Sequence, residues 1–172
     1  NRIRVGSGGV MLPNHSPLVI AEQFAALEAA FPGRIDLGIG RAPGSDPVVT
    51  ALLRSSGATS DVEEFPNNVQ DIRMLLNPDG ATLRLGGSGH GGDGSNGGRD
   101  YVVKATPLAA GAPPVWLLGS SDYSARLAAQ LGLPYVFAHH FSGEGTAQAL
   151  ALYRDGFSAS EELAAPRTFL TV

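Results

Sequence analysis

The sequence predicts an α/β protein with a parallel sheet, and three observations lead to this prediction. Short apolar runs rich in β-branched residues alternate along the chain with segments whose apolar residues recur at helical spacing. Such alternation requires parallel strands joined by helical crossovers. About five strands fit either an open doubly wound sheet or a sector of a (β/α)8 barrel. A complete barrel needs about 250 residues, so a chain of 172 residues favours a sector.

The first elements follow this pattern in order. Residues 2–12 are expected to form a buried strand, because their glycines and β-branched residues suit a backbone that is closely approached. Ser16 and Pro17 are typical of a helix start, with the serine oxygen as the expected cap. A second strand is expected at residues 35–39. The helix between these strands has one apolar face, formed by Ile20, Phe24, Leu27 and Phe31.

The remaining elements continue the alternation. A short helix is expected at residues 46–54, and a strand or hairpin arm is expected at residues 101–105. Residues 63–76 predict a longer helix with one apolar side, formed by Val69, Ile72, Leu75 and Leu76. Three further apolar runs are expected strands: residues 115–118, 135–138 and 168–172. Two further segments are expected helices: residues 121–131 and 145–157.

Residues 86–98 contain eight glycines in thirteen positions. The backbone entropy of glycine predicts a flexible surface loop here, which either contributes to a lid or is an insertion without function. The chain starts without Met in a strand-like run and stops in another, at Val172. We therefore expect residues 1–172 to be the central part of a single barrel domain, incomplete at both ends.

Composition excludes several classes of function. The net charge is −4, and the 12 lysines and arginines are scattered, so no basic stripe is present to bind nucleic acid. Cysteine is absent, which excludes disulfides and thiolate metal sites. No apolar run approaches the roughly 20 residues that span a bilayer, and no export signal is evident. We expect a cytoplasmic protein without nucleic acid or membrane partners.

One segment predicts an anion site. The strand at residues 115–118 runs directly into Gly119, Ser120 and Ser121 and then into a helix. This order gathers free N–H groups and hydroxyls at a helix N-terminus, where a phosphate is favoured by hydrogen bonding and by the helix dipole. Tyr123 and Ser124, one turn later, can also face the anion. The alternative is that Ser120 or Ser121 only caps the helix.

A second segment places a cation at the end of a strand. Arg41 directly follows the strand at residues 35–39, at the carboxyl end where barrels and open sheets bind ligands. Its guanidinium group is suited to a phosphate, although a surface arginine at the start of a loop is the alternative. Gly38 and Gly40 either leave room for a ligand or relieve packing.

Other chemistry is less supported. His15 is expected in a strand-to-helix connection and His90 in the flexible loop. His139 and His140 are adjacent, so strand alternation sends them to opposite faces and argues against a shared metal. No evident carboxylate pair and no HExxH, Walker or GxSxG signature is found. We expect no metal, and we assign no general base.

Two segments resemble the bacterial luciferase-like monooxygenase family, particularly its small oxidoreductase branch. They are LPNHSPLVIAEQFAALEAAFPGRIDLGIGRAPG (residues 12–44) and LLGSSDYSARLAAQLGLPYVFAHHF (residues 117–141). The resemblance implies a (β/α)8 barrel that holds FMN at the carboxyl ends of its strands. Arg41, Ser121 and Ser124 match positions that hold the flavin phosphate, with Ser120 and Tyr123 as neighbours. Gly8 and Gly9 match a strand position, often a cis peptide, against the isoalloxazine ring; a bulge is the alternative.

The resemblance also implies a function for the full-length protein. We expect a flavin-dependent oxidoreductase or monooxygenase that uses reduced FMN and oxygen on a small organic substrate. The reduced flavin is either bound or supplied by a separate flavin reductase. A non-catalytic flavin-binding protein and a deazaflavin-dependent dehydrogenase are the alternatives. The family's frequent catalytic histidine lies before Asn1, so the 172 residues alone are expected to be inactive.

A homodimer is the expected assembly. The helix at residues 18–31 carries a face of small residues, Ala21, Ala25 and Ala29, that permits close approach of another helix. In the family this region contributes to a dimer, while ordinary packing against the barrel is the alternative.

Overall fold

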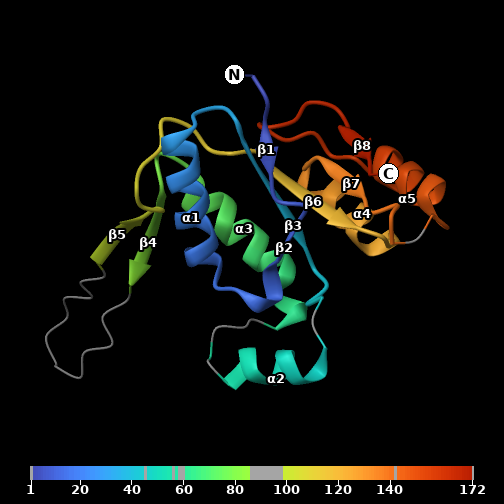
Figure 1. The fold of residues 1–172 in the computed structure, drawn as a ribbon. Coiled ribbons are helices and arrows are strands. Elements are labelled where there is room, and N and C mark those ends of the chain that lie inside the picture. Colours follow the sequence, from blue (N-terminus) through green and yellow to red (C-terminus); the bar gives the residue numbers. More distant parts are fainter. Residues whose placement is uncertain are drawn as a thin grey trace, which may run out of the picture.

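The computed structural model describes residues 2–44, 46–55, 57, 61–85, 99–141 and 143–171. Its main sheet contains β1 (Val5–Gly6), β2 (Val10–Met11), β3 (Ile35–Gly40), β6 (Val115–Gly119), β7 (Tyr135–Phe137) and β8 (Thr168–Leu170). β1 and β2 both pair with β3, which is followed across the sheet by β6, β7 and β8, and every pairing is parallel. The sheet curls into half of a barrel (Figure 1). The predicted barrel sector of about five strands is therefore confirmed.

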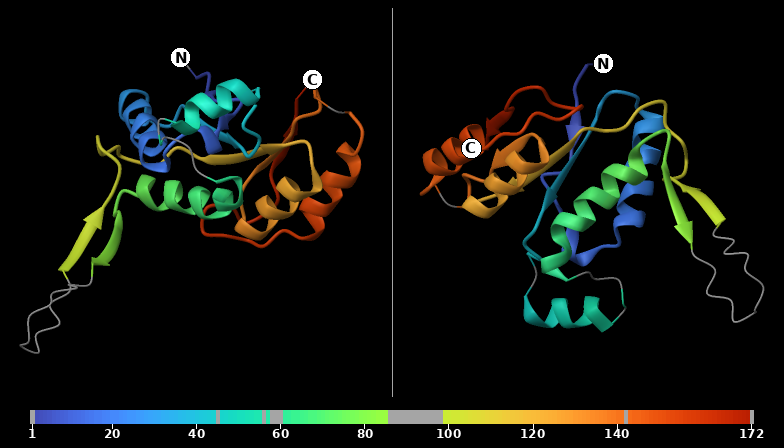
Figure 2. Two further views of the ribbon diagram at one scale, coloured as in Figure 1. Left: turned by 90° about the horizontal axis from the view of Figure 1, so that it is seen from below. Right: turned by 180° about the vertical axis from the view of Figure 1, so that it is seen from behind.

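Helices cover the outer face of this sheet. α1 (Pro17–Ala30) and α3 (Phe65–Leu76) lie side by side over the first strands, and α4 (Asp122–Leu131) and α5 (Thr146–Asp155) cover the later ones (Figures 1 and 2). The predicted apolar side of α3 is buried at Val69, Ile72, Leu75 and Leu76. Gly132 ends α4 with a left-handed backbone, φ 62°, which glycine adopts without steric cost.

Strand alternation divides the residues of β3 between two environments. Ile35, Leu37 and Ile39 are buried in the core that the sheet forms with the helices. Asp36 and Gly38 point to the other, inner face of the half-barrel, where they line a cavity. The inner face of the later strands is formed in the same way by Trp116, Leu118, Val136 and Phe169.

The first predicted strand is interrupted at the glycine pair, and the prediction that it is buried is wrong, because Ile3 and Val5 are 69% and 58% exposed. The pairing offset is 30 residues at Gly6 and Asp36 but 29 residues at Val10 and Ile39, so the strand contains one extra residue. This is a bulge. The peptide bond between Gly8 and Gly9 is cis. The cis bond implied by the resemblance and the bulge considered as its alternative are therefore present together.

Other local features complete or correct the prediction. Ser16 is the N-cap of α1, but its side chain makes no capping hydrogen bond, so the expected serine cap is wrong. A different helix, α2 (Pro47–Ser55), follows β3 and does have a side-chain cap. The Oδ1 atom of Asp46 accepts hydrogen bonds from the N–H groups of Val48 and Val49. Two short 3-10 helices are η1 (Leu12–Asn14) and η2 (Val62–Glu64).

A two-stranded hairpin projects from the body of the molecule (Figures 1 and 2). It consists of β4 (Ala81–Leu85) and β5 (Arg99–Val103), paired antiparallel. The sequence analysis predicts the second arm only, at residues 101–105, although residues 82–85 alternate between polar and apolar side chains. The glycine-rich loop expected at residues 86–98 lies outside the described residues.

The alanines of α1 pack inside the chain. Ala21 and Ala25 are buried against the core, whereas Ala29 is exposed. Packing within the barrel therefore accounts for two of the three residues, and the homodimer stays a prediction. In the described part of the chain, no helix has the length and apolar character needed to cross a membrane. The same residues contain no group of three or more metal-ligating side chains.

Candidate functional site

The two predicted halves of the site meet at the carboxyl edge of the sheet. β3 and β6 are adjacent, and Gly40 lies beside Leu118, so Arg41 and Ser120 leave the sheet next to each other. The guanidinium carbon of Arg41 lies 4.1 Å from the centre of the Tyr123 ring. A cation over an aromatic face is attracted by the ring quadrupole. The structure thus places Arg41 against the first turn of α4.

The start of α4 presents open hydrogen-bond donors. Ser121 is the N-cap, and its side chain makes no capping bond. The N–H groups of the first helical turn have no acceptor within the helix. Ser120 and Ser121 are exposed, and Tyr123 is 38% exposed. Backbone donors, two hydroxyl groups and one guanidinium group therefore gather in one exposed place, which we call the nest (Arg41 and residues 120–124).

Ser124 has a different position within the nest. It is only 5% exposed, and its hydroxyl donates to the carbonyl of Ser121 at 2.9 Å. A Cβ atom on Gly119 would overlap the Ser124 hydroxyl, so this close approach requires glycine. Ser124 therefore supports the nest from inside, while Ser120 and Ser121 form its surface.

Tyr135 braces the nest from the neighbouring strand, β7. Its hydroxyl donates to the carbonyl of Gly119 at 3.1 Å. Burial raises the pKa of this hydroxyl above its ordinary value, although a hydrogen bond with Ser124 opposes the shift. The group therefore stays protonated and remains a donor. The sequence analysis does not identify Tyr135 as part of the site. The one sequence feature that points to it is a hydroxyl-bearing residue within an otherwise apolar strand.

One acidic side chain lies in the first turn of α4. Asp122 would oppose the binding of an anion through its charge. Its Oδ2 accepts a hydrogen bond from Nε2 of Gln148 on α5, at 2.8 Å. The carboxylate is thus engaged by the neighbouring helix.

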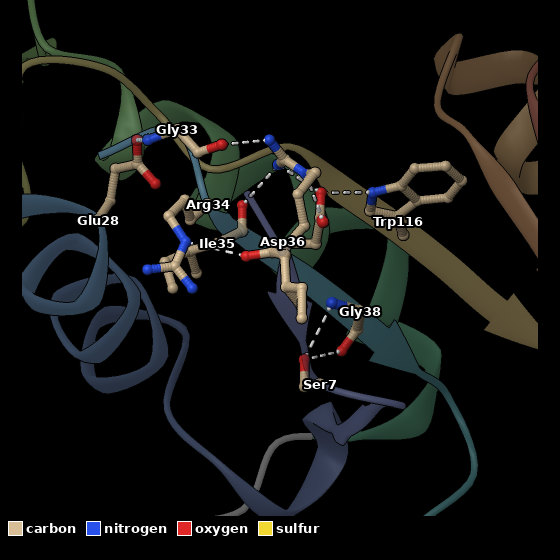
Figure 3. A network of polar contacts seen from close by, with 10 residues as sticks. Ser7, Glu28, Gly33, Arg34, Ile35, Asp36, Gly38 and Trp116 are labelled. Atoms are coloured by element: carbon tan, nitrogen blue, oxygen red, sulfur yellow. Dashed lines mark hydrogen bonds and ion pairs between the residues drawn. The ribbon is translucent and has the colours of Figure 1, made fainter. Parts of the chain in front are cut away.

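Gly8 lines the inner cavity, whereas Gly9 lies against the backbone of Gly38. A Cβ atom built on Gly8 would have no heavy atom within 4 Å, so one side of this backbone is open. Gly38, on β3, has no such space, because a Cβ atom there would overlap the carbonyl of Ser7. The Ser7 hydroxyl donates to the carbonyl of Gly38 at 2.8 Å and accepts from its N–H at 2.9 Å (Figure 3).

A cavity of about 300 Å³ lies on the inner face, between Gly8 and Phe169. Toward the amino ends of the strands, its lining includes an ionic cluster of Arg4, Asp36 and Trp116. Figure 3 shows the hydrogen bond between Asp36 and Trp116 in this cluster. Asp36 accepts two hydrogen bonds from Arg4, both at 2.8 Å, and one from Nε1 of Trp116 at 3.1 Å. Burial raises the pKa of Asp36, but the bonds from Arg4 and Trp116 and the charges of Arg4 and Arg167 outweigh it, so the pKa is lowered.

Two larger depressions contain none of the predicted site residues. One, of about 420 Å³, is apolar and lies between α1 and β1 near Phe24. The other, of about 470 Å³, lies near the ion pair of Arg73 and Glu162, whose nitrogen and oxygen are 2.9 Å apart. Size alone would direct attention away from the nest, whereas the chemistry of the side chains identifies it.

The two adjacent histidines have separate partners. Nδ1 of His139 lies 2.9 Å from the Thr146 hydroxyl, and Nδ1 of His140 lies 3.1 Å from the Thr171 hydroxyl. Both residues lie in a turn that follows β7, and not in the strand itself. His15 lies between η1 and α1, in the connection where it was predicted.

Comparison with known proteins agrees with this geometry. Residues 1–171 match the family model described as luciferase-like monooxygenase. A luciferase-like monooxygenase of Escherichia coli K12 is 46% identical over 170 residues, which cover 99% of this chain and 45% of the relative. The N-acetyl-S-alkylcysteine monooxygenase of Bacillus subtilis 168 is 34% identical, covering 83% of this chain and 38% of that protein.

A solved structure shows the same fold. The crystal structure of apo-MsnO8 is 39% identical, with a TM-score of 0.79, and the match covers 99% of this chain and 44% of that one. The chain spans less than half the length of the curated relatives that it matches. The family model, the identity to its members and the shared half-barrel lead to one conclusion. The chain belongs to the luciferase-like monooxygenase family.

Proposed function

We propose that the full-length protein is an FMN-dependent monooxygenase that uses reduced flavin and oxygen on a small organic substrate. The observation that carries this proposal is the position of Arg41 over Tyr123, at the open start of α4. A half-barrel of this family with a cationic nest at its carboxyl edge is suited to a cofactor that ends in a phosphate.

The residues fit FMN at two points. The phosphate of FMN is an anion, and Arg41 offers a planar fork of donors that matches its oxygens. The hydroxyls of Ser120 and Ser121 and the N–H groups of the first turn of α4 supply further donors. At the other end of the site, the open side of Gly8 leaves room for a flat ring to lie against the backbone.

Each part of the chain then has a distinct task. Bound reduced FMN supplies the electrons with which oxygen is activated. Arg41 and the nest bind the phosphate, Ser124 and Tyr135 hold the nest in shape, and Gly8 admits the ring. Beyond Gly8, the inner cavity is lined by the apolar side chains of Trp116, Leu118, Val136 and Phe169, which favour an organic substrate beside the ring and disfavour water.

The relatives support the class of reaction. The Bacillus subtilis relative is named for monooxygenation of N-acetyl-S-alkylcysteine, a small organic molecule. We propose a substrate of comparable size for this protein, without transferring that compound to it. A separate flavin reductase as the source of reduced FMN, and a homodimer as the assembly, belong to the same proposal.

The test uses the full-length protein and three cofactors. FMN, riboflavin and a deazaflavin are titrated separately, with binding followed through flavin fluorescence. Preferred binding of FMN is the expected result, with oxygen consumption above that of the reductase, NADH and FMN without this protein. Preference for the deazaflavin without such additional oxygen consumption would identify a dehydrogenase. Tight FMN binding without additional oxygen consumption would identify a flavin-binding protein without this activity.

A further inference from the structure

His140 contacts a residue that lines the inner cavity. β7 is parallel to β6, so the residues that follow β7 leave the sheet at the same edge as the nest. Nδ1 of His140 is 3.1 Å from the hydroxyl oxygen of Thr171, and Thr171 lines the cavity. The imidazole ring is therefore one hydrogen bond away from the cavity wall.

The bonds of Thr171 decide which nitrogen of His140 carries the proton. The Thr171 hydroxyl donates its one hydrogen to the carbonyl of Phe137 at 3.1 Å. Its oxygen then accepts from the backbone N–H of His139, also at 3.1 Å. Since the hydroxyl has no second hydrogen to give, Nδ1 of His140 must be the donor in their contact. In the neutral ring, Nε2 is then left with a free lone pair.

His139 provides a natural comparison. Its Nδ1 contacts the hydroxyl of Thr146, which donates to the carbonyl of Gly143 at 3.0 Å. The same reasoning places the proton of His139 on Nδ1. Its ring lies against Gly143, where an added Cβ atom would come within 3.1 Å of Cε1. The ring of His139 thus contacts the loop before α5, and that of His140 contacts the cavity-lining threonine.

The other polar side chains that line the cavity are already bonded within the chain. Arg4, Asp36 and Trp116 bond to one another, and Ser7 bonds to Gly38. For Nε2 of His140, in contrast, no hydrogen bond is seen to any residue that the structure describes. The ring is exposed and packs against Phe141 in a tilted arrangement, with 4.3 Å between the ring centres.

We propose that His140 is a substrate-contacting residue whose Nε2 accepts a hydrogen bond from a donor group of the substrate, with the apolar part of that substrate in the cavity. This inference rests on the proposed function, because it takes the carboxyl edge as the active face. The substrate class is an uncharged molecule with an apolar body and one hydroxyl or comparable donor. A carboxylate is disfavoured, because the cationic side chain that lines the cavity, Arg4, is already paired with Asp36.

The test compares two matched probes in the FMN-loaded full-length protein. n-Hexanol and methyl pentyl ether have the same number of heavy atoms, but only the alcohol donates a hydrogen bond. Binding is followed through the flavin absorbance and, independently, through the fluorescence of Trp116, with Trp116→Phe as the blank. We expect the alcohol to bind roughly three- to tenfold more tightly than the ether. All titrations are run in the same buffer.

Three variants make the ratio of the two affinities diagnostic. His140→Ala should reduce the alcohol-to-ether ratio to about one, because a single hydrogen bond distinguishes the probes. Thr171→Val should lower the ratio, because nothing then holds the proton on Nδ1. His139→Ala should leave the ratio unchanged. A variant that is partly unfolded binds both probes more weakly and leaves the ratio of the two affinities unchanged. The ratio therefore distinguishes loss of the hydrogen bond from loss of the fold.

Several outcomes would overturn the inference. These are equal binding of alcohol and ether to the wild type, a ratio that survives His140→Ala, tighter binding of hexanoate than of hexanol, or no signal from either probe. Failure of FMN to bind would instead count against the proposed function. In that case the Trp116 signal still reports whether the alcohol preference and its dependence on His140 exist.

Discussion

Replacement of Arg41 by alanine tests the nest most directly. The guanidinium group is partly buried and is held 4.1 Å above the Tyr123 ring, so it is positioned before any ligand arrives. A hydrogen bond between charged partners contributes about 1.5–3 kcal/mol. Loss of this contact should raise the Kd for FMN roughly 10- to 150-fold.

Riboflavin is the matched control ligand, because it lacks the phosphate. Titration of full-length wild type and Arg41→Ala with both flavins, followed through flavin fluorescence, should show a loss for FMN only. Arg41→Lys should fall between the two, since it keeps the charge and loses the planar fork. Tyr123→Leu removes the aromatic face under the guanidinium and should weaken FMN binding by roughly two- to fivefold.

The double variant Arg41→Ala/Tyr123→Leu shows whether the two residues act together. If Tyr123 contributes through Arg41, the double variant should bind FMN about as weakly as Arg41→Ala alone. Equal loss of FMN and riboflavin in Arg41→Ala, or no loss of either, would refute the assignment of Arg41 to the phosphate.

Three further predictions concern neighbouring residues. Ser121→Ala should raise the Kd for FMN roughly two- to tenfold without lowering the Tm. Ser124 is buried, so Ser124→Ala should lower the free energy of unfolding in urea by about 1–3 kcal/mol. The reverse pattern would show that the roles of the two serines are exchanged. Gly119→Ala should destabilise the protein by about 1–3 kcal/mol in the same assay, because the new methyl group overlaps the Ser124 hydroxyl, and an unchanged midpoint would contradict this. The pKa of Asp36 in the folded protein is lowered from its ordinary value of 3.8. The ionised carboxylate therefore contributes its full stability above pH 3.8. This contribution is lost as the pH falls through the lowered pKa. The stability difference between wild type and Asp36→Asn should therefore shrink on acidification below pH 3.8, and a difference independent of pH would argue against the ion pair with Arg4.

Elements whose signals are local could be predicted from the sequence. The spacing of the four apolar residues predicts the buried face of α1 at Ile20 and Phe24 only, because Leu27 and Phe31 are 41% and 50% exposed. Gly132 predicts the end of α4, because a left-handed backbone depends only on nearby residues. The expected serine cap at Ser16 failed for a related reason. A side chain at a helix start has several possible partners, and spacing does not decide which of them it meets.

By itself, the sequence determined the alternation of strands and helices and the order of the two motifs, because periodicity is a property of neighbouring residues. Only the tertiary structure decided that Arg41 meets Tyr123, that Ser124 is covered while Ser121 is open, and that His140 meets Thr171. These partners lie on different strands and loops, and which of them meet depends on strand order and register. A hydrogen bond between residues 31 positions apart leaves no trace in local spacing.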